Sequence, residues 1–281
     1  MADRLTGKDP VPSTAFADAW TQVDATENPQ FFVDVLDATR TRLLERARRS
    51  PEEFFARFAP AAGLDVLDVG CGTGDMLRLL APFVAPGRAV GIDISSTMIG
   101  EARARTAADS PNVHFELGDI LDLRFEDRAF DRVMVGQVLV HLADPWTGLE
   151  RLCRVLGSKG KLWITEMDWG SIMVESTDRE LSRRFTRLTA DGLRNGHIVR
   201  ELPWRLRKLG FATIAIEADV RFSDGADALH RWFIEPAVSH FRRTGAFSPE
   251  EAEAFLDDLG QRAAEGRYFS SLNSYSMIAS R

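Results

Sequence analysis

Cysteine, tyrosine and long apolar runs are scarce in this chain of 281 residues, which has only two cysteines and two tyrosines. Cys71 and Cys153 are too few for a disulfide framework and lack the spacing of a zinc site, so we expect no metal. No apolar run is long enough to span a bilayer, and the N-terminus lacks the apolar centre of a signal peptide. We therefore expect a cytoplasmic protein without a membrane partner.

An excess of positive charge is also missing. The formal net charge is −7 at pH 7, whereas binding to a phosphate backbone needs clustered lysine and arginine. Two short basic clusters, at 46–49 and 242–243, fall on expected helices and are most simply explained as solvated faces. These features argue against a nucleic acid as the main partner. They leave a small molecule as the expected substrate of a monomer or a homodimer.

The stretch from Val66 to Asp75, V-L-D-V-G-C-G-T-G-D, is the most informative part of the sequence. An apolar strand ends there in three glycines spaced two apart, and a helical pattern follows. Glycine has no Cβ, so such a turn lets backbone N–H groups approach a ligand closely. The dinucleotide fingerprint G-x-G-x-x-G would need a glycine where Asp75 stands.

Strand and helix patterns alternate after this turn and predict right-handed crossovers in a parallel, doubly wound sheet. The expected helices of this part cover 75–85, 96–108 and 145–156, and a helical stretch covers 177–209. The expected strands cover 64–69, 88–93, 112–117, 129–135, 160–167, 211–220 and 269–280.

Helical segments flank the alternating part. Asn28 precedes a proline and predicts the N-cap of a helix over 29–49, and the capping-box pattern at Ser50 opens a second, short helix. Another capping-box pattern, at Ser248, lies in an insertion before the last strand. The chain thus divides into a loose tail (1–14), an N-terminal helical cap (15–61), a core (62–223), a helical insertion over the active site (224–266) and a final core strand (267–281).

The G-x-G-x-G spacing resembles motif I of the class I S-adenosylmethionine (SAM) methyltransferases, of the small-molecule and natural-product type in the quinone-biosynthesis-like group. The resemblance covers residues 62–220 well and the flanking helical segments only loosely. It implies a Rossmann-like α/β sheet of seven strands with the last one antiparallel. It also implies SAM as the cofactor and a methyltransferase of the EC 2.1.1 class.

Polar groups at successive strand ends extend the resemblance. Asp93 ends the second strand, where a carboxylate can accept both ribose hydroxyls. Each group taken alone has a plain structural explanation, such as a tight turn, but all of them fall on the carboxyl edge of the sheet, where such folds bind ligands. The resemblance assigns Asp68, Gly70, Cys71 and Gly72 to the turn around the methionine part of SAM, Ile94 and Met98 to the adenine face, Asp119 and Ile120 to the adenine edge, and Gln137 and Val138 to the methionine side of the pocket.

Methyl transfer from a sulfonium is an in-line displacement, so the protein has to align the nucleophile, exclude water and, where necessary, remove a proton. His141 and Asp168 are the candidate catalytic residues. His141 either accepts a proton or packs in the turn after the fourth strand. Asp168 either accepts a proton or orients a substrate group, or it caps the next segment. The histidines at 197, 230 and 240 are expected to be structural.

Tryptophan is more frequent than the length leads one to expect, with six in the chain. Some aromatic side chains could form an apolar roof over the cofactor, which would suit a flat or hydrophobic metabolite of secondary metabolism better than a peptide. Helix packing is the alternative explanation. The candidate substrate residues are Trp20, Phe32, Trp169 and Trp232. The acceptor atom, which is oxygen, nitrogen or carbon, stays open.

Three other functions compete with methyl transfer. An enzyme of the same fold could bind SAM and catalyse a cyclisation or an elimination, because fold does not fix function. A nicotinamide dehydrogenase is disfavoured by Asp75, and neither Tyr268 nor Tyr275 forms the Y-x-x-x-K pair of short-chain dehydrogenases. A non-catalytic binding module would need a closed pocket without room for an acceptor.

Overall fold

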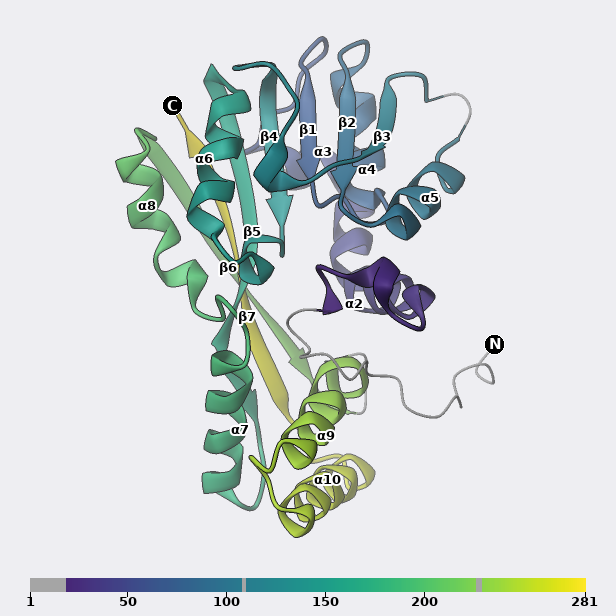
Figure 1. The fold of residues 1–281 in the computed structure, drawn as a ribbon, viewed down its shortest axis with the longest axis vertical. Coiled ribbons are helices and arrows are strands. Elements are labelled where there is room, and N and C mark those ends of the chain that lie inside the picture. The colour runs from purple at the N-terminus through teal and green to yellow at the C-terminus, as the bar shows by residue number, and fades with distance from the viewer. Residues whose placement is uncertain (1–18, 108–109, 226–228) are drawn as a thin grey trace.

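The computed structural model describes residues 19–107, 110–225 and 229–281 (Figure 1). The expected loose tail at 1–14 lies outside the described residues, as does the start of the helical cap at 15–18. Among the described helices, none has both the length and the apolarity that crossing a membrane requires.

A seven-stranded sheet forms the centre of the molecule, with the strand order β3-β2-β1-β4-β5-β7-β6. Strands β1 to β5 are parallel, and β7 runs antiparallel between β5 and β6. This order confirms the predicted doubly wound α/β fold with an antiparallel last strand. The strands are β1 (Val66–Val69), β2 (Ala89–Asp93), β3 (Val113–Leu117), β4 (Phe130–Gly136), β5 (Leu156–Val174), β6 (Thr213–Ser223) and β7 (Ser270–Ser280).

Helices cover both faces of the sheet, because the central strands bury apolar side chains on both sides. α6 (Pro145–Val155) and α8 (Leu202–Lys208) share one apolar core with the strands. α4 (Asp75–Val84) and α5 (Ser96–Ala104) share a second core on the opposite face. Leu80 of α4 is fully buried there, and burial of such a side chain stabilises the fold by about 1.5–3 kcal/mol.

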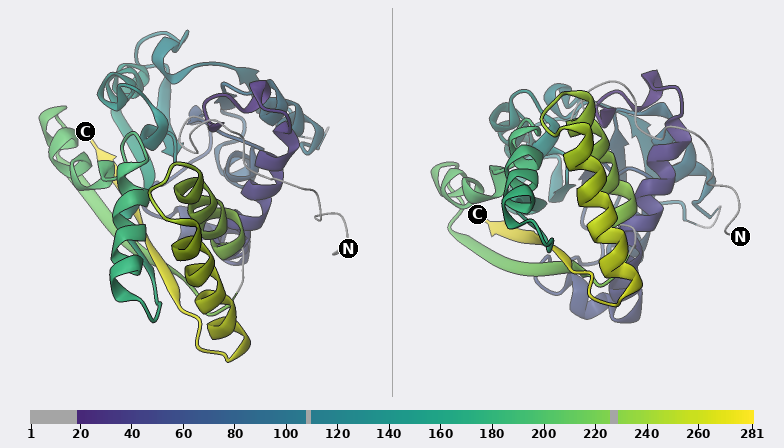
Figure 2. Two further views of the ribbon diagram at one scale, coloured as in Figure 1. Left: turned by 60° about the horizontal axis from the view of Figure 1, so that its bottom comes forward. Right: turned by 90° about the horizontal axis from the view of Figure 1, so that it is seen from below.

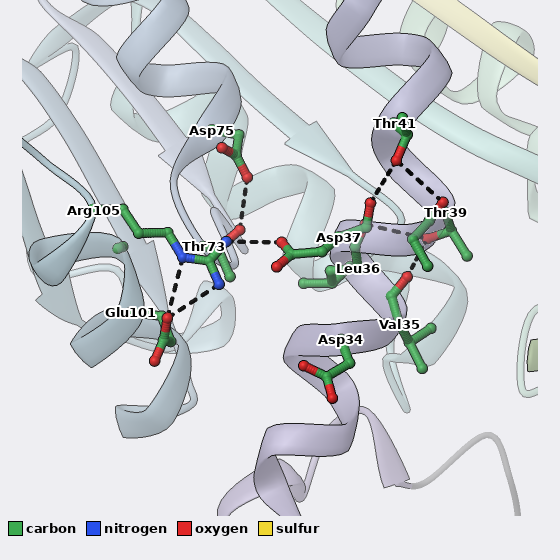
Figure 3. A network of polar contacts seen from close by, with 12 residues as sticks. Asp34, Val35, Leu36, Asp37, Thr39, Thr41, Thr73, Asp75, Glu101 and Arg105 are labelled. Atoms are coloured by element: carbon green, nitrogen blue, oxygen red, sulfur yellow. Dashed lines mark hydrogen bonds and ion pairs between the residues drawn. The ribbon is translucent and has the colours of Figure 1, made fainter. Parts of the chain in front are cut away.

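The N-terminal cap consists of the long helix α2 (Pro29–Arg49) and the short helix α3 (Pro51–Phe55). Arg105 joins α2 to the core, as Figure 3 shows. Its Nη1 donates to Asp37 of α2 (2.8 Å), and its Nη2 lies 3.1 Å from the carboxylate of Glu101 on α5. This contact fixes α2 to α5, and Leu36 of α2 lies beside Gly72 of the glycine turn.

The predicted capping boxes have different outcomes. At the start of α10 (Pro249–Ala264), the Ser248 hydroxyl accepts from the Glu251 N–H (3.1 Å), and the Glu251 carboxylate accepts from the Ser248 N–H (2.8 Å). This box is confirmed. The box at Ser50 is wrong, because the Ser50 side chain caps no described N–H group, and the Asn28 side chain does not cap α2 within the described residues either. In both places the helix begins at a proline, whose fixed φ suits the first helical position.

Strand β5 is much longer than predicted and reaches residue 174 instead of 167. Asp168 was expected to follow the end of the strand, but β7 continues to pair beyond it, with a register shift between Asp168 and Met173. The polar break in the sequence is thus a β-bulge inside the strand, which bends it without ending it. As a result β5, β7 and β6 extend past the carboxyl edge of the other strands, as Figure 1 shows.

The extended strands carry a second, smaller core with the C-terminal helices. α7 (Arg179–Asp191), α9 (Glu235–Arg243) and α10 pack there around Phe185, Phe241 and other apolar side chains. A π-helical turn, η5 (His230–Ile234), leads into α9. Figure 2 shows α9 and α10 side by side beyond the edge of the sheet, close to α7. The helical insertion thus stands next to the carboxyl edge, where the site is expected.

Candidate active site

The glycine turn after β1 has the backbone geometry that a close ligand contact requires. Gly70, Gly72 and Gly74 all adopt positive φ, at 70°, 55° and 77°. A Cβ on Gly70 would lie 2.2 Å from Cγ2 of Val138, so only glycine fits between the turn and the segment after β4. The turn therefore holds the ends of β1 and β4 close together.

Asp75 stabilises this turn and explains why an acid stands where the dinucleotide fingerprint has glycine. The Thr73 hydroxyl donates to one oxygen of the Asp75 carboxylate (2.8 Å), as Figure 3 shows, and Arg78 donates to the other (2.7 Å). The carboxylate also lies in the first turn of α4, where the helix dipole favours negative charge. Asp75 thus ties the turn to α4.

Asp93 lies at the end of β2 with its carboxylate held from two sides. The Gly72 N–H donates to Oδ2 (2.9 Å), and the Ser95 N–H donates to Oδ1 (2.9 Å). Burial raises the pKa of Asp93, and these backbone donors partly offset that rise. Each oxygen keeps further acceptor capacity, so the carboxylate can take two vicinal hydroxyls in a bidentate arrangement.

A cavity of about 140 Å³ runs along the carboxyl ends of β1, β2 and β4. The structure brings together in its lining most of the residues predicted to bind cofactor, substrate or a proton. They are Gly70, Gly72, Asp93, Ile94, Met98, Asp119, Ile120, Gln137, Val138, His141, Trp20 and Trp169. One Asp119 oxygen caps the 3-10 turn η2 (Ile120–Asp122) by accepting from the Leu121 N–H (2.9 Å).

The roof of this cavity is the segment before α2, which contains the 3-10 turn η1 (Val23–Ala25). Asp24 fixes it to the start of α5 by accepting from the Ser95 hydroxyl (2.6 Å) and from the Ser96 N–H (2.6 Å). Burial alone would raise the pKa of Asp24, but these hydrogen bonds hold it well below its usual value. The contact places Trp20 over the cavity.

Residues 66–160 match the family model described as a methyltransferase domain. This part of the chain is a methyltransferase domain. The lining described above fits SAM, since it combines backbone groups in a glycine turn, a doubly anchored carboxylate and apolar side chains. The region that matches the family starts at β1 and ends within β5. It therefore contains β1, β2 and β4, whose ends border this cavity.

Known proteins resemble the chain beyond this methyltransferase domain. An uncharacterized 37.1 kDa protein in transposon TN4556 of Streptomyces fradiae is 37% identical over 225 residues, which are 77% of this chain and 62% of that protein. The O-methyltransferase cnsE of Penicillium expansum is 36% identical over 121 residues, 42% of this chain and 44% of that protein. The chain therefore spans less than two thirds of either relative. The YcgJ protein of Bacillus subtilis shares the fold at 18% identity, with a TM-score of 0.59 over 83% of this chain and 98% of that one.

Two of the predicted substrate residues do not line the 140 Å³ cavity. Phe32 is buried behind Trp20, with its ring edge-on at a centroid distance of 5.0 Å. Trp232 packs against Phe31 at 5.2 Å. Both therefore support the aromatic roof from behind, while Trp20 and Trp169 face the cavity.

His141 faces the cavity from the 3-10 turn η3 (Leu139–His141), and Glu166 holds that turn in place. The buried Glu166 carboxyl accepts from the Leu139 N–H (2.9 Å). Burial raises the pKa of Glu166 to about 8, although backbone donors of the turn oppose the rise. The Trp20 ring stacks on His141 at a centroid distance of 6.3 Å.

Asp168, the other candidate base, has a different environment. Arg200 Nε donates to its Oδ2 (3.0 Å), and Arg200 Nη2 lies 2.9 Å from Oδ1. Asp168 lines neither this cavity nor the groove described next. Its carboxylate fixes the 3-10 turn η4 (Ile198–Arg200) to β5, so the geometry favours a structural ion pair over proton transfer.

A much larger groove of about 1010 Å³ adjoins the 140 Å³ cavity, which we call the cofactor cavity because its lining fits SAM. The groove lies between α2–α3 and the strands β5, β7 and β6. Asp68 and Cys71 line this groove. Burial raises the pKa of Asp68 to about 7 and that of the Cys71 thiol well above its usual value, so the thiol is unreactive. The two spaces share Thr39, Arg40, Gly70, Gly136, Gln137 and Phe233.

The sequence patterns did not reveal three residues of this site, namely Asp24, Arg40 and Glu166 as the support of His141. Arg40 Nη1 lies 3.5 Å from the position that a Cβ on Gly72 would take, so its guanidinium stands over the glycine turn. No local motif surrounds Asp24 or Arg40, because the residues next to them in the structure, Ser95 and Gly72, lie in distant parts of the chain. Glu166 stood at the expected strand end, but its contact with η3 depends on how the segment after β4 folds back.

Proposed function

We propose that this protein transfers the methyl group of SAM to an oxygen, nitrogen or carbon atom of a small aromatic or hydrophobic metabolite, in secondary metabolism. SAM supplies an electrophilic methyl group, so the protein needs to position it and shield it from water. The observation that carries the proposal is the cavity itself. It places Asp93 at one end and opens at Gln137 into a space large enough for an acceptor.

Each part of the cavity has a task in this proposal. The Asp93 carboxylate accepts the two ribose hydroxyls, while Ile94 and Met98 pack against the adenine face. Asp119 and Ile120 meet the adenine edge. The Gly70 turn and the backbone at Gln137 surround the methionine part, with Asp68 and Arg40 at its amino-acid end.

His141 is the proposed proton acceptor where the acceptor group carries a proton. It lines the cavity near Gln137, and histidine is the side chain that most often serves as a general base. Glu166 acts as a positioning residue, because it bonds the turn that carries His141. We further propose a cytoplasmic monomer or homodimer without a nucleic-acid partner.

The test is incubation of the purified protein with SAM and a panel of aromatic metabolites, followed by mass spectrometry. The proposal predicts S-adenosylhomocysteine together with a product heavier by one methyl group. A product that gains no methyl, formed without S-adenosylhomocysteine, would instead indicate a cyclisation or elimination that uses SAM as a bound charge. The His141→Asn variant should bind SAM normally and lose turnover if the acceptor needs deprotonation.

A further inference from the structure

The large groove has the size and position of an acceptor site. Its volume of about 1010 Å³ matches the upper end of the range for ligand pockets, about 300–1,000 Å³. The cofactor cavity alone falls below that range, so the two spaces together form the complete site. They join at Gln137 and Phe233, next to the methionine part of the proposed cofactor position.

Apolar and small polar side chains of the sheet form the floor of the groove. Trp163, which is buried, lies among methionine, leucine and isoleucine side chains of β4, β5 and β7. Its Nε1 donates to the Ser276 hydroxyl (2.6 Å), and Ser274 lies nearby in the lining. Such a floor suits a flat, mostly apolar body with a few polar groups.

Most of the arginines at the groove are already engaged. Arg57 pairs with Glu217 at 2.7 Å, and Arg42 donates to the Phe222 carbonyl (3.1 Å). Arg46 lies over the Phe54 ring at 5.9 Å. These contacts join α2 and the segment after α3 to the edge strand β6, and they join α2 to α3.

Two other arginines face the groove without such contacts. Arg40 of α2 and Arg221 of β6 are partly buried, and neither has a hydrogen bond or an ion pair within the part of the chain that the structure describes. Asp219 and Asp68 also face the groove and partly balance their charges. Burial lowers the pKa of Arg221, and the neighbouring Arg40 charge lowers it further. An anion between the two guanidinium groups would relieve this repulsion.

We propose that the groove is the acceptor site and that Arg221, together with Arg40, binds an oxyanion of the acceptor, either a carboxylate or a phosphate. This inference rests on the proposed methyl transfer. Guanidinium groups bind carboxylate and phosphate through paired, charge-assisted hydrogen bonds. The acceptor is therefore an amphiphilic acid, with its apolar body over Trp163 and its acidic group at Arg221.

The two arginines have different positions, and this difference predicts different effects. Arg40 lines both spaces, so its loss should lower the affinity for both SAM and the acceptor. Arg221 lines only the groove, so its loss should lower the affinity for the acceptor and leave SAM affinity unchanged. Arg221→Gln is therefore the decisive variant. Arg183→Gln, which removes an exposed arginine on α7, is the matched control.

The experiment uses two fluorescent probes that differ only by an anionic group, anilinonaphthalene sulfonate and the uncharged phenylnaphthylamine. The wild-type protein should bind the sulfonate about tenfold more tightly, since hydrogen bonds to charged groups have this strength. Arg221→Gln should remove this preference and leave phenylnaphthylamine binding unchanged, whereas Arg221→Lys should keep part of it. Unchanged phenylnaphthylamine binding also shows that the variant is folded.

Displacement of the bound probe then identifies the oxyanion. Naphthoate or naphthyl phosphate should displace it at lower concentration than neutral naphthol. Whichever of the two acids displaces the probe at the lower concentration identifies the acidic group of the acceptor. Equal displacement by naphthol, or an undiminished sulfonate preference in Arg221→Gln, would overturn the inference. Failure of the proposed methyl transfer is recognised separately, because it would appear as absence of S-adenosylhomocysteine and of a methylated product in the assay with SAM, whatever the probes show.

Discussion

Glu166 is a buried residue that supports the proposed site through the backbone of the turn carrying His141. It bonds the backbone of η3 and so fixes the position of His141. Burial shifts its pKa from the ordinary 4.5 to about 8. The native protein therefore binds a proton between these pH values that the unfolded chain releases. The free energy of unfolding should fall as the pH rises through this range.

The Glu166→Gln variant tests this linkage. Glutamine keeps the shape and the acceptor oxygen but cannot ionise, so the variant should lose less stability than the wild type between pH 5 and pH 8.5. Urea unfolding at several pH values measures the difference, which should reach about 1–3 kcal/mol at the alkaline end. Asp68, whose pKa is raised to about 7, contributes a similar slope to both proteins, so the comparison isolates Glu166. Parallel pH profiles would contradict the assignment.

Residues differ in how far the sequence reveals them. Asp93 and the three glycines belong to a continuous pattern of strand, turn and helix, so their place could be predicted. Asp24 and Arg40 could not be predicted, because a contact such as that between Asp24 and Ser95 joins residues 71 positions apart. Asp168 was expected at the site because it follows an apolar strand, but its partner Arg200 lies 32 residues later.

At the scale of elements, local patterns predicted the regular parts of the fold well. The helix over 29–49 and the final strand agree with the structure within one residue. The length of β5 was missed, since strand length here depends on pairing with β7, which comes about a hundred residues later. The groove is a consequence of this extension and of α2, so the sequence patterns could not predict it.

The segment around η1 is the element whose role is most open to test. Asp24 bonds the first N–H groups of α5, where the helix dipole favours a negative charge. Asp24→Ala should lower the free energy of unfolding by about 0.5–2 kcal/mol, as the loss of a helix cap does. Because the same contact places Trp20 over the cavity, SAM affinity should also fall several-fold.

Urea unfolding and calorimetric titration measure the two effects of this substitution. Thr147, which bonds Asp144 at the start of α6, offers a control away from the cavity. Thr147→Ala should leave SAM affinity unchanged. If Asp24→Ala lowers stability but binds SAM as the wild type does, the segment is not a roof over the cofactor.

At the scale of the whole molecule, the fold places two spaces side by side at one edge of the sheet. The parallel strands β1, β2 and β4 end at the narrow cavity, and the extended strands β5, β7 and β6 form a wall of the groove. The C-terminal helices support that wall from below, as Figure 1 shows. The proposed methyl transfer assigns the narrow cavity to the methyl donor and the groove to the acceptor.

The most direct test of this account is a calorimetric titration with SAM and, separately, with NAD. The wild-type protein should bind SAM and not NAD, and Asp93→Ala should bind SAM more than about tenfold more weakly through loss of the ribose hydrogen bonds. Glu180→Ala, which removes an exposed carboxylate on α7, should bind SAM as the wild type does. Unchanged SAM affinity in Asp93→Ala, or tighter binding of NAD than of SAM, would contradict the account.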